Sequence, residues 1–509
     1  MNNRDPIIVG AGQLTHKSKN SGDFLHPLEG MKTAVKRAAD DAECKDLIST
    51  ADALHVVNIF TWNYRKSARM LAEQLDINPV IKEYTTIGGD TPQWLVNRVA
   101  DNLVSGKNDV SILAGCEVMH SVKSALAAGM PTEGFQDNFE NITPVGGDSE
   151  GVLIGNKRFG NNMDELDHFV DMPVRIYPLI ENALRAKEGL TIGQQIENLG
   201  KFGETFSAVA AKDPYAWSRN PLTSTQVITP SPKNRMISFP YTKLLNANLY
   251  VDQAAALIMT TPYMAQKFGI PKEKWVYLHG GQDATDTWFF SERKDIADSP
   301  AIKAGVMDAL HQAKLTLEDI SFFDFYSCFP CMPRLYRLVL GIEHADPRPM
   351  TLTGGLPYFG GPGSNYTMHS IAKAVDRCRV EPEKFGLITA NGWYCTKHST
   401  GIYSCLKPPK TWNRTPPTLF QKRLSLPKSL EIDKAPSGSF LVDSYTVWFS
   451  RQGEPEIGIL IGRTESGKRA LAQTPKDNKD ILYTMMRKEW VGATGKVVGQ
   501  KDKINIVDF

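Results

Sequence analysis

Short apolar runs alternate with stretches of helical periodicity over the first 115 residues. Apolar runs that predict strands lie at 7–9, 53–59, 81–87 and 110–114, and helical stretches lie between them at 28–43, 65–75 and 92–105. In the last stretch Leu95, Val99 and Leu103 recur every four residues, which is the spacing of one helix face. Alternating strands and helices predict a mostly parallel sheet that is covered by helices.

The same alternation returns between residues 246 and 405. Strands are predicted at 252–260, 275–278, 320–325 and 385–389, and helices at 300–313, 331–340 and 364–376. The intervening residues 116–245 are rich in Gly, Asn, Asp and Pro, with helical pieces at 178–187 and 191–211. We therefore expect an N-terminal half (1–115), a loop-rich insertion or cap (116–245) and a C-terminal half (246–405).

A proline-rich segment separates this α/β region from a different pattern at the C-terminal end. Residues 406–438 contain six prolines, a density that favours extended chain over regular structure. Short strand-like runs follow at 440–442, 445–449, 457–461, 496–498 and 504–507. Turns such as Ser466-Gly467 separate them, so we expect a linker and then a small antiparallel β-barrel over 439–509.

Composition narrows the class of partner. The 509 residues carry 58 Lys and Arg against 56 Asp and Glu, which leaves no strong field for nucleic acid or an anionic membrane. An apolar run of about 20 residues is absent, and the N-terminus does not have the pattern of a secretory signal. Seven cysteines without regular spacing do not form a disulfide framework. We expect a cytoplasmic protein whose partner is a small molecule or another protein.

Each α/β region holds a glycine pair directly ahead of a predicted helix. The first is Gly88-Gly89, before the helix at 92–105, and the second is Gly360-Gly361, before the helix at 364–376. A glycine-rich turn at a helix start exposes backbone N–H groups, which suit an anion or a carbonyl oxygen. The alternative is that these glycines only make tight turns.

Three strings, taken together and in this order, resemble the thiolase superfamily. Residues 112–119 are similar to its Ala-Gly-Gly-x-Glu-x-Met strand, and residues 252–256 to its Asp-Gly-Ala-Ala-Ala. Residues 319–329 look like the strand that leads into its His-Asp-Cys-Phe or Asn-Glu-Ala-Phe motif. The likeness is to the sterol-carrier-protein thiolase branch, and within it to the bacterial thiolase-like protein type 1 group, which has an extra C-terminal β-domain. It implies two βαβαβαββ halves in five layers, α/β/α/β/α, and acyl-CoA chemistry.

The residues that thiolase chemistry needs are replaced in this chain. The resemblance places Gly88 at the position of the nucleophilic Cys, and no Cys lies between Cys44 and Cys116. Gly361 takes the place of the His in Gly-His-Pro, and Asn391-Gly392 takes the place of the second Cys. Since a working thiolase needs an activated thiolate and an oxyanion hole, we expect acetoacetyl-CoA thiolysis to be at background.

Other side chains remain as candidates. By the resemblance Tyr326 faces the reacting carbonyl, where a phenol can donate to an oxyanion or move a proton; the alternative is a half-buried packing residue. Cys328 and Cys331 form a Cys-x-x-Cys pair that is expected to be structural, since no second pair completes a zinc site. We therefore predict no metal site.

The loop that is expected after the strand at 385–389 supplies the last candidates. His398 is the candidate general base, because His titrates near neutrality. Asn391 is a candidate oxyanion donor, or only a turn residue. Substrate contacts are assigned to Gly88, Gly89, Gly361, Cys328 and Cys395, in a pocket between the two glycine turns that Tyr326, Asn391 and His398 would line.

Two classes of function follow from these residues. The chain is an acyl-CoA-handling enzyme, either an acyltransferase by relationship or a retro-aldol carbon–carbon lyase that uses Tyr326. Alternatively it is a non-catalytic protein that binds acyl-CoA or a partner. Coenzyme A or acyl-CoA is the expected ligand, with no covalently bound cofactor, and the family implies a homodimer unless the extra domain prevents it.

Overall fold

The N-terminal half is built around a mixed five-stranded sheet. The computed structural model describes residues 4–18, 23–62, 64, 66–130, 152–476 and 478–509. The strands lie in the order β3 (Ile81–Thr85), β2 (Ala53–Val56), β4 (Ser111–Val118), β8 (Asp252–Thr260) and β1 (Ile7–Thr15). β2 pairs in parallel with β3 and β4, whereas β8 is antiparallel to β4 and β1. The short β5 (Val152–Ile154) adds to the outer edge of β3.

The C-terminal half repeats this order. Its strands are β10 (Ile320–Asp324), β11 (Phe385–Gly392), β12 (Lys397–Ser404) and β9 (Val276–Thr285). Pro349 and Met350 accept hydrogen bonds from the backbone of Phe323 and Phe325, so this extended segment occupies the place that β3 has in the first half. β1 and β9 join the halves through a two-residue antiparallel pairing. The predicted duplication is therefore confirmed.

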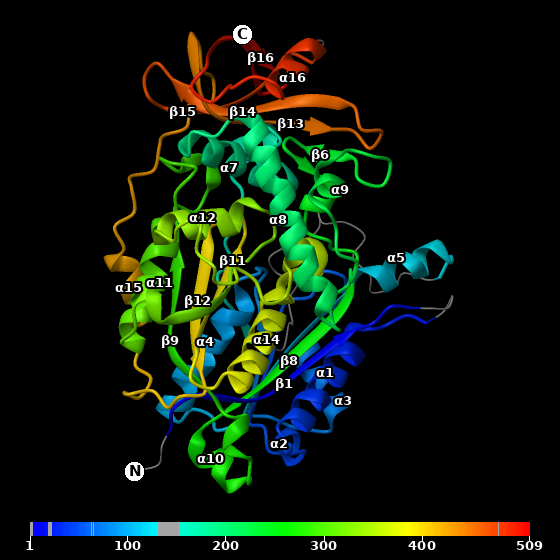
Figure 1. The fold of residues 1–509 in the computed structure, drawn as a ribbon, viewed down its shortest axis with the longest axis vertical. Coiled ribbons are helices and arrows are strands. Elements are labelled where there is room, and N and C mark those ends of the chain that lie inside the picture. The colour runs from blue at the N-terminus through cyan, green and yellow to red at the C-terminus, as the bar shows by residue number, and fades with distance from the viewer. Residues whose placement is uncertain (1–3, 19–22, 63, 65, 131–151, 477) are drawn as a thin grey trace.

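Helices cover both sheets and fill the space between them. α1 (Pro27–Asp41) and α3 (Ser67–Leu75) pack on the first sheet, and α11 (Pro300–Ala313) and α12 (Cys331–Leu340) on the second. α4 (Thr91–Ser105) and α14 (Tyr366–Val380) lie in the middle, where Leu95, Val99 and Ile371 share one core with residues of both sheets. The predicted five-layer α/β/α/β/α arrangement is confirmed (Figure 1). The short helices α2 (Asp46–Ser49) and α10 (Pro262–Lys267) complete the two halves.

The insertion contains more helix than its composition predicts. Its elements are α5 (Met119–Ala127), α6 (Met163–Asp167), α7 (Pro173–Lys187), α8 (Ile192–Lys212), α9 (Ser224–Ile228), β6 (Met236–Ser238) and β7 (Tyr241–Thr242). α7 begins at Pro173 and continues through Pro178. The sequence pattern predicts a helix that starts at Pro178, because proline favours the first turn of a helix. α13 (Gly355–Tyr358) lies against α8. Residues 131–151 of the expected insertion lie outside the described residues.

The C-terminal strands close into a five-stranded barrel, as predicted. β13 (Ser439–Phe449) pairs with both β14 (Pro455–Thr464) and β16 (Thr494–Lys501), and the ring is completed by β15 (Arg469–Gln473) and β17 (Ile504–Asp508). All pairings are antiparallel except the one between Gln473 and Ile506. The barrel lies at one end of the molecule, where α16 (Lys479–Met485) packs on it (Figure 1).

Two details of this region differ from the sequence-based expectation. The sequence pattern does not predict β15, because its apolar run has only three residues, 470–472, and begins after Arg469. The Arg469 guanidinium is fully buried and donates to the carbonyl of Arg293 at 2.7 Å. The linker is not wholly irregular, since Pro417–Arg423 form the helix α15, which starts at a proline that suits a first turn. No helix in the described parts of the chain is long and apolar enough to cross a membrane.

Candidate active site

The two glycine turns meet at the centre of the fold. Gly88 and Gly89 precede α4, and Gly361 precedes the short turn 363–365 that leads into α14. The amide N–H of Gly88 donates to Ser364 Oγ at 3.1 Å, and Thr367 Oγ1 donates to the carbonyl of Gly89 at 3.0 Å. The helix starts of the two halves are therefore in direct contact.

A lysine and an aspartate occupy the space beside Gly88. Lys397 Nζ forms an ion pair with Asp90 Oδ1 at 3.0 Å and donates to the carbonyl of Ile87 at 2.8 Å. A Cβ added to Gly88 would lie 2.5 Å from Lys397 Nζ, and one added to Gly392 would lie 2.9 Å from Lys397 Cε and collide with Asp90 Oδ1. The ion pair thus fills the positions that side chains at both glycines would need.

Tyr326 borders the same space. Its backbone N–H donates to Thr389 Oγ1 at 3.0 Å, and its ring meets the ring of Tyr366 edge-on at 5.5 Å. A Cβ on Gly89 would collide with the Tyr326 hydroxyl. Burial, with smaller effects of Cys328, Tyr366 and Asp90, raises the pKa of Tyr326 well above that of a free phenol. The hydroxyl therefore stays protonated and is a donor.

His398 lies on the opposite side of its sheet. The sequence predicts that His398 lies in a loop after the strand at 385–389, but residues 397–404 form β12, which is buried along its length. Successive side chains of a strand point to opposite faces, so Lys397 faces α4 and His398 faces α11. There His398 Nε2 lies 3.2 Å from Asp286 Oδ2 and 3.2 Å from the carbonyl oxygen of Cys395.

The environment of His398 favours its charged form. Burial lowers the pKa of the imidazole, but hydrogen bonds to Asp286 and Cys395 outweigh this and raise the pKa to about 9. A His that stays protonated at neutral pH is a poor base. The general-base role of His398 therefore stays a prediction, and in this environment the residue is better placed as a donor to Asp286.

Asn391 and the two candidate cysteines gather around Tyr177, which the sequence analysis did not single out. Asn391 Nδ2 donates to the Tyr177 hydroxyl at 2.7 Å, and that hydroxyl donates to the carbonyl of Trp393 at 2.9 Å. Cys328 is in hydrogen-bonding contact with Tyr177, and burial raises the pKa of its thiol to about 12. Cys395 lies close to both and has a left-handed backbone, with φ of +58°.

The predicted residues thus divide into two groups. Tyr326, Gly88, Gly89 and the Gly361 turn belong to the central group, with Lys397 and Asp90. The side chains of Asn391, His398, Cys328 and Cys395 belong to a second group around Tyr177 and Asp286. The two groups adjoin, because the Asn391 carbonyl lies beside Gly89 and Cys328 acts on Tyr326. Asp90 is adjacent to the Gly88-Gly89 pair and Lys397 to His398, so a charged residue in a buried turn or strand was the signal that could have found them.

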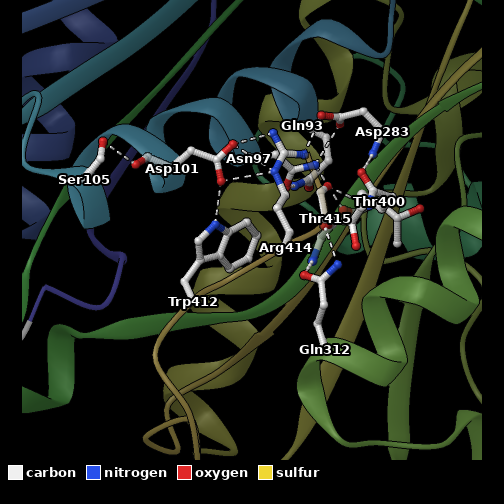
Figure 2. Close-up of polar contacts among 12 residues, drawn as sticks. Gln93, Asn97, Asp101, Ser105, Asp283, Gln312, Thr400, Trp412, Arg414 and Thr415 are labelled. Carbon is white, nitrogen blue, oxygen red and sulfur yellow. Dashed lines mark hydrogen bonds and ion pairs between the residues drawn. The ribbon is translucent and has the colours of Figure 1, made fainter. Parts of the chain in front are cut away.

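A buried polar network holds the outer part of α4 in place (Figure 2). Asn97 Nδ2 donates to Asp283 Oδ1 of β9 at 2.9 Å, and Arg414 of the linker bridges Asp283 at 2.6 Å and Asp101 at 2.8 Å. Trp412 also donates to Asp101, at 2.8 Å. The linker therefore fixes the helix whose first turn carries the central group.

Comparison with known proteins agrees with this architecture. Residues 420–502 match the family model of the thiolase-like protein type 1 additional C-terminal domain. The crystal structure of a monomeric SCP2-thiolase like protein type 1 from Mycobacterium smegmatis is 30% identical over 100% of both chains, with a TM-score of 0.84. An acetyl-CoA acetyltransferase of Methanocaldococcus jannaschii is 24% identical over 330 residues, 64% of this chain and 73% of the relative. The Ltp2-ChsH2(DUF35) aldolase is 18% identical, with a TM-score of 0.58, over 79% of this chain and 98% of that chain.

The fold and the site together define an α/β protein of the thiolase fold with an additional C-terminal barrel. The similarity to the Mycobacterium smegmatis protein covers the whole length of both chains, and it assigns this chain to a narrower group within that fold. The chain belongs to the SCP2-thiolase-like protein type 1 family, which is related to the acetyl-CoA acetyltransferases.

Proposed function

We propose that this protein binds acyl-CoA thioesters and does not carry the acyl group on a cysteine at the centre of the fold. The observation that carries the proposal is the Lys397–Asp90 ion pair, which fills the space beside Gly88 and Gly392. Acyl transfer through sulfur needs a thiolate that is stabilised at a helix start. Here the start of α4 offers an ammonium group, a carboxylate and a phenol instead.

The test measures turnover, covalent modification and binding on one sample. Incubation with acetoacetyl-CoA and free CoA is expected to give thiolysis at background and no acyl adduct by intact-protein mass. Titration calorimetry with CoA and acetyl-CoA is expected to show binding. Robust thiolysis with an acyl-enzyme would overturn the first half of the proposal, and the absence of CoA binding would overturn the second.

A second candidate function, carbon–carbon bond cleavage, is favoured by the position of Tyr326. Its protonated hydroxyl lies against Gly89 and near Asp90. In a retro-aldol cleavage of a 3-hydroxyacyl thioester, a carboxylate such as Asp90 would take the hydroxyl proton and the phenol would protonate the enolate. A distant relative of the same fold is named an aldolase.

Replacement of one hydroxyl tests this candidate. Tyr326→Phe is expected to reduce cleavage of a 3-hydroxyacyl-CoA by about 10²–10⁴-fold while CoA affinity stays within about twofold, because only a proton donor is lost. Tyr358→Phe is the control, since Tyr358 is equally buried but lies on α13. An active parent protein whose rate is unchanged by Tyr326→Phe would exclude the lyase role of Tyr326.

A further inference from the structure

The central group combines three functional side chains that rarely occur together in a protein interior. An ammonium group (Lys397), a carboxylate (Asp90) and a protonated phenol (Tyr326) converge on the two glycines before α4. Buried lysines that only stabilise a fold have no requirement for a phenol beside them. Lysine is also the side chain that forms imines with carbonyl substrates.

The group is buried but not sealed. The side chains of Lys397 and Asp90 each keep 8% of their surface exposed, and Gly89 is partly exposed. Because Gly89 has no side chain, the Tyr326 hydroxyl and the Asn391 carbonyl pack directly against its backbone. A ketone would reach the amine from the exposed edge of the ion pair.

The polar partners of Lys397 also suit a nucleophile. Asp90 lies 3.0 Å from Nζ and is the acceptor through which the ammonium can lose its proton. The other contact is a hydrogen bond from Nζ to the Ile87 carbonyl at 2.8 Å, which orients Nζ at the start of α4. The Tyr326 hydroxyl lies against Gly89, next to the glycine that Lys397 contacts, and there it can donate to a carbonyl oxygen.

From this arrangement we infer that Lys397 is a catalytic residue that captures the ketone of a 3-oxoacyl thioester, a substrate other than the 3-hydroxyacyl thioester of the lyase candidate, as an imine. The inference rests on the proposed acyl-CoA binding and names the substrate class of the same site. Lys397 passes a proton to Asp90, and the free amine forms a C–N bond to the ketone carbon. The C=O electron pair moves to the oxygen, which takes a proton from Tyr326, and the nitrogen returns one to Tyr326.

Loss of water completes the step. The nitrogen lone pair expels the hydroxyl group, which leaves as water with the proton held by Asp90. The products are a protonated imine on Lys397, the Asp90 carboxylate and one water, so atoms and charge balance without an oxidant or reductant. The cationic imine withdraws electrons from the neighbouring C2 atom, so it makes the C2 hydrogens of the substrate more acidic.

Reductive trapping tests the inference. The full-length protein is incubated with acetoacetyl-CoA and cyanoborohydride, which reduces an imine to a stable secondary amine, and is then mapped by peptide mass spectrometry. We expect at least tenfold more modification on Lys397 than on any other lysine. Lys397→Arg, which keeps the charge beside Asp90, should lose this adduct, and Asp90→Asn should reduce it at least tenfold.

A second ion-paired lysine supplies the matched control. Lys187 pairs with Asp295 at 2.9 Å on the surface, so Lys187→Arg should leave the adduct on Lys397 unchanged. CoA binding without an adduct on Lys397 in the parent protein would overturn the imine inference and leave the proposed function intact. The absence of CoA binding would remove both. The parent protein alone decides the outcome, even where a variant does not fold.

Discussion

At Gly88 the absence of a side chain makes room for a buried ion pair. Its φ of +152° lies outside the range that other residues readily adopt, and Lys397 and Asp90 stand where its Cβ would be. The same ion pair lies directly against Gly392, where it occupies the position of a Cβ. The two glycines and the ion pair therefore form one unit, in which no single member can change independently.

Gly88→Ala is accordingly expected to destabilise the protein by about 1–3 kcal/mol more than a control glycine does, because the buried ion pair must move. Gly189→Ala is the control, since Gly189 also has a positive φ, +67°, but has open space at its Cβ position. Urea unfolding measures both free energies. Equal costs at the two sites would show that Lys397 and Asp90 yield without penalty.

His398 gives the stability of the protein a defined pH dependence. The folded pKa of about 9 exceeds the unfolded value of about 6.5, so the protonated imidazole stabilises the fold fully below pH 6.5. This contribution, about 3 kcal/mol from the difference of the two pKa values, is lost as the pH rises through 9. Asp286, Cys395 and Arg293 are the groups that act on this pair.

The measurement is the free energy of unfolding of the parent and of His398→Gln between pH 6 and 10. We expect the parent to lose stability over this range and the variant to lose less, because glutamine cannot titrate. A variant that follows the parent curve in parallel would assign the pH dependence to other groups.

At the scale of elements, α4 is unusual because its polar stripe is buried as deeply as its apolar one. Gln93 and Asn97 are completely buried, yet each has hydrogen-bond partners from the second sheet or the helix itself. Arg414 completes the stripe by neutralising Asp283 and Asp101 (Figure 2). An element from beyond the two halves thus holds a central helix.

Arg414→Met should therefore cost about 3–5 kcal/mol, since it leaves the buried Asp283 without its counter-charge. Arg69→Met is the comparison, because Arg69 pairs with Glu73 on an exposed helix face, where such pairs contribute under about 1 kcal/mol. Thermal unfolding measures both. A loss below about 1 kcal/mol at Arg414 would show that solvent reaches Asp283.

The elements also show what the sequence can predict. Regular apolar spacing placed α4, α11 and α12 within a residue of their observed bounds, because apolar side chains recur at helical spacing on their buried faces. The sequence predicts a loop in place of β12 and does not predict β15, because polar or charged residues occupy buried positions in both strands and have partners distant in the chain. The same reason hid Lys397 and Asp90. Tyr326 and the two glycine turns were found because local strings mark them.

At the scale of the whole molecule, the barrel is attached to the cap through a strand pairing and through side chains of α7. β6 and β7 extend the barrel sheet from β13, through a pairing of Trp448 with Ser238. Asn182 of α7 donates to the Tyr445 carbonyl at 2.8 Å, and Arg185 forms a two-pronged ion pair with Glu489. Such contacts predict that the barrel and the core unfold together.

Hydrogen exchange in increasing denaturant tests this expectation. Amides of β13 and of β11 should lose protection at the same denaturant concentration, whereas amides of α15, which has no buried residue, should exchange at lower concentration. Earlier exchange throughout β13 would show that the barrel is an independent unit.

The position of β1 has a consequence for how the chain is made. β1 leaves the ribosome well before its ladder partners, since β8 ends at Thr260 and β9 begins at Val276. The apolar residues 7–9 therefore remain without their strand partners while the cap is synthesised. Because long-range pairings form slowly and leave apolar segments exposed in the meantime, nascent chains of this protein are expected to depend on chaperones until residue 276 has emerged.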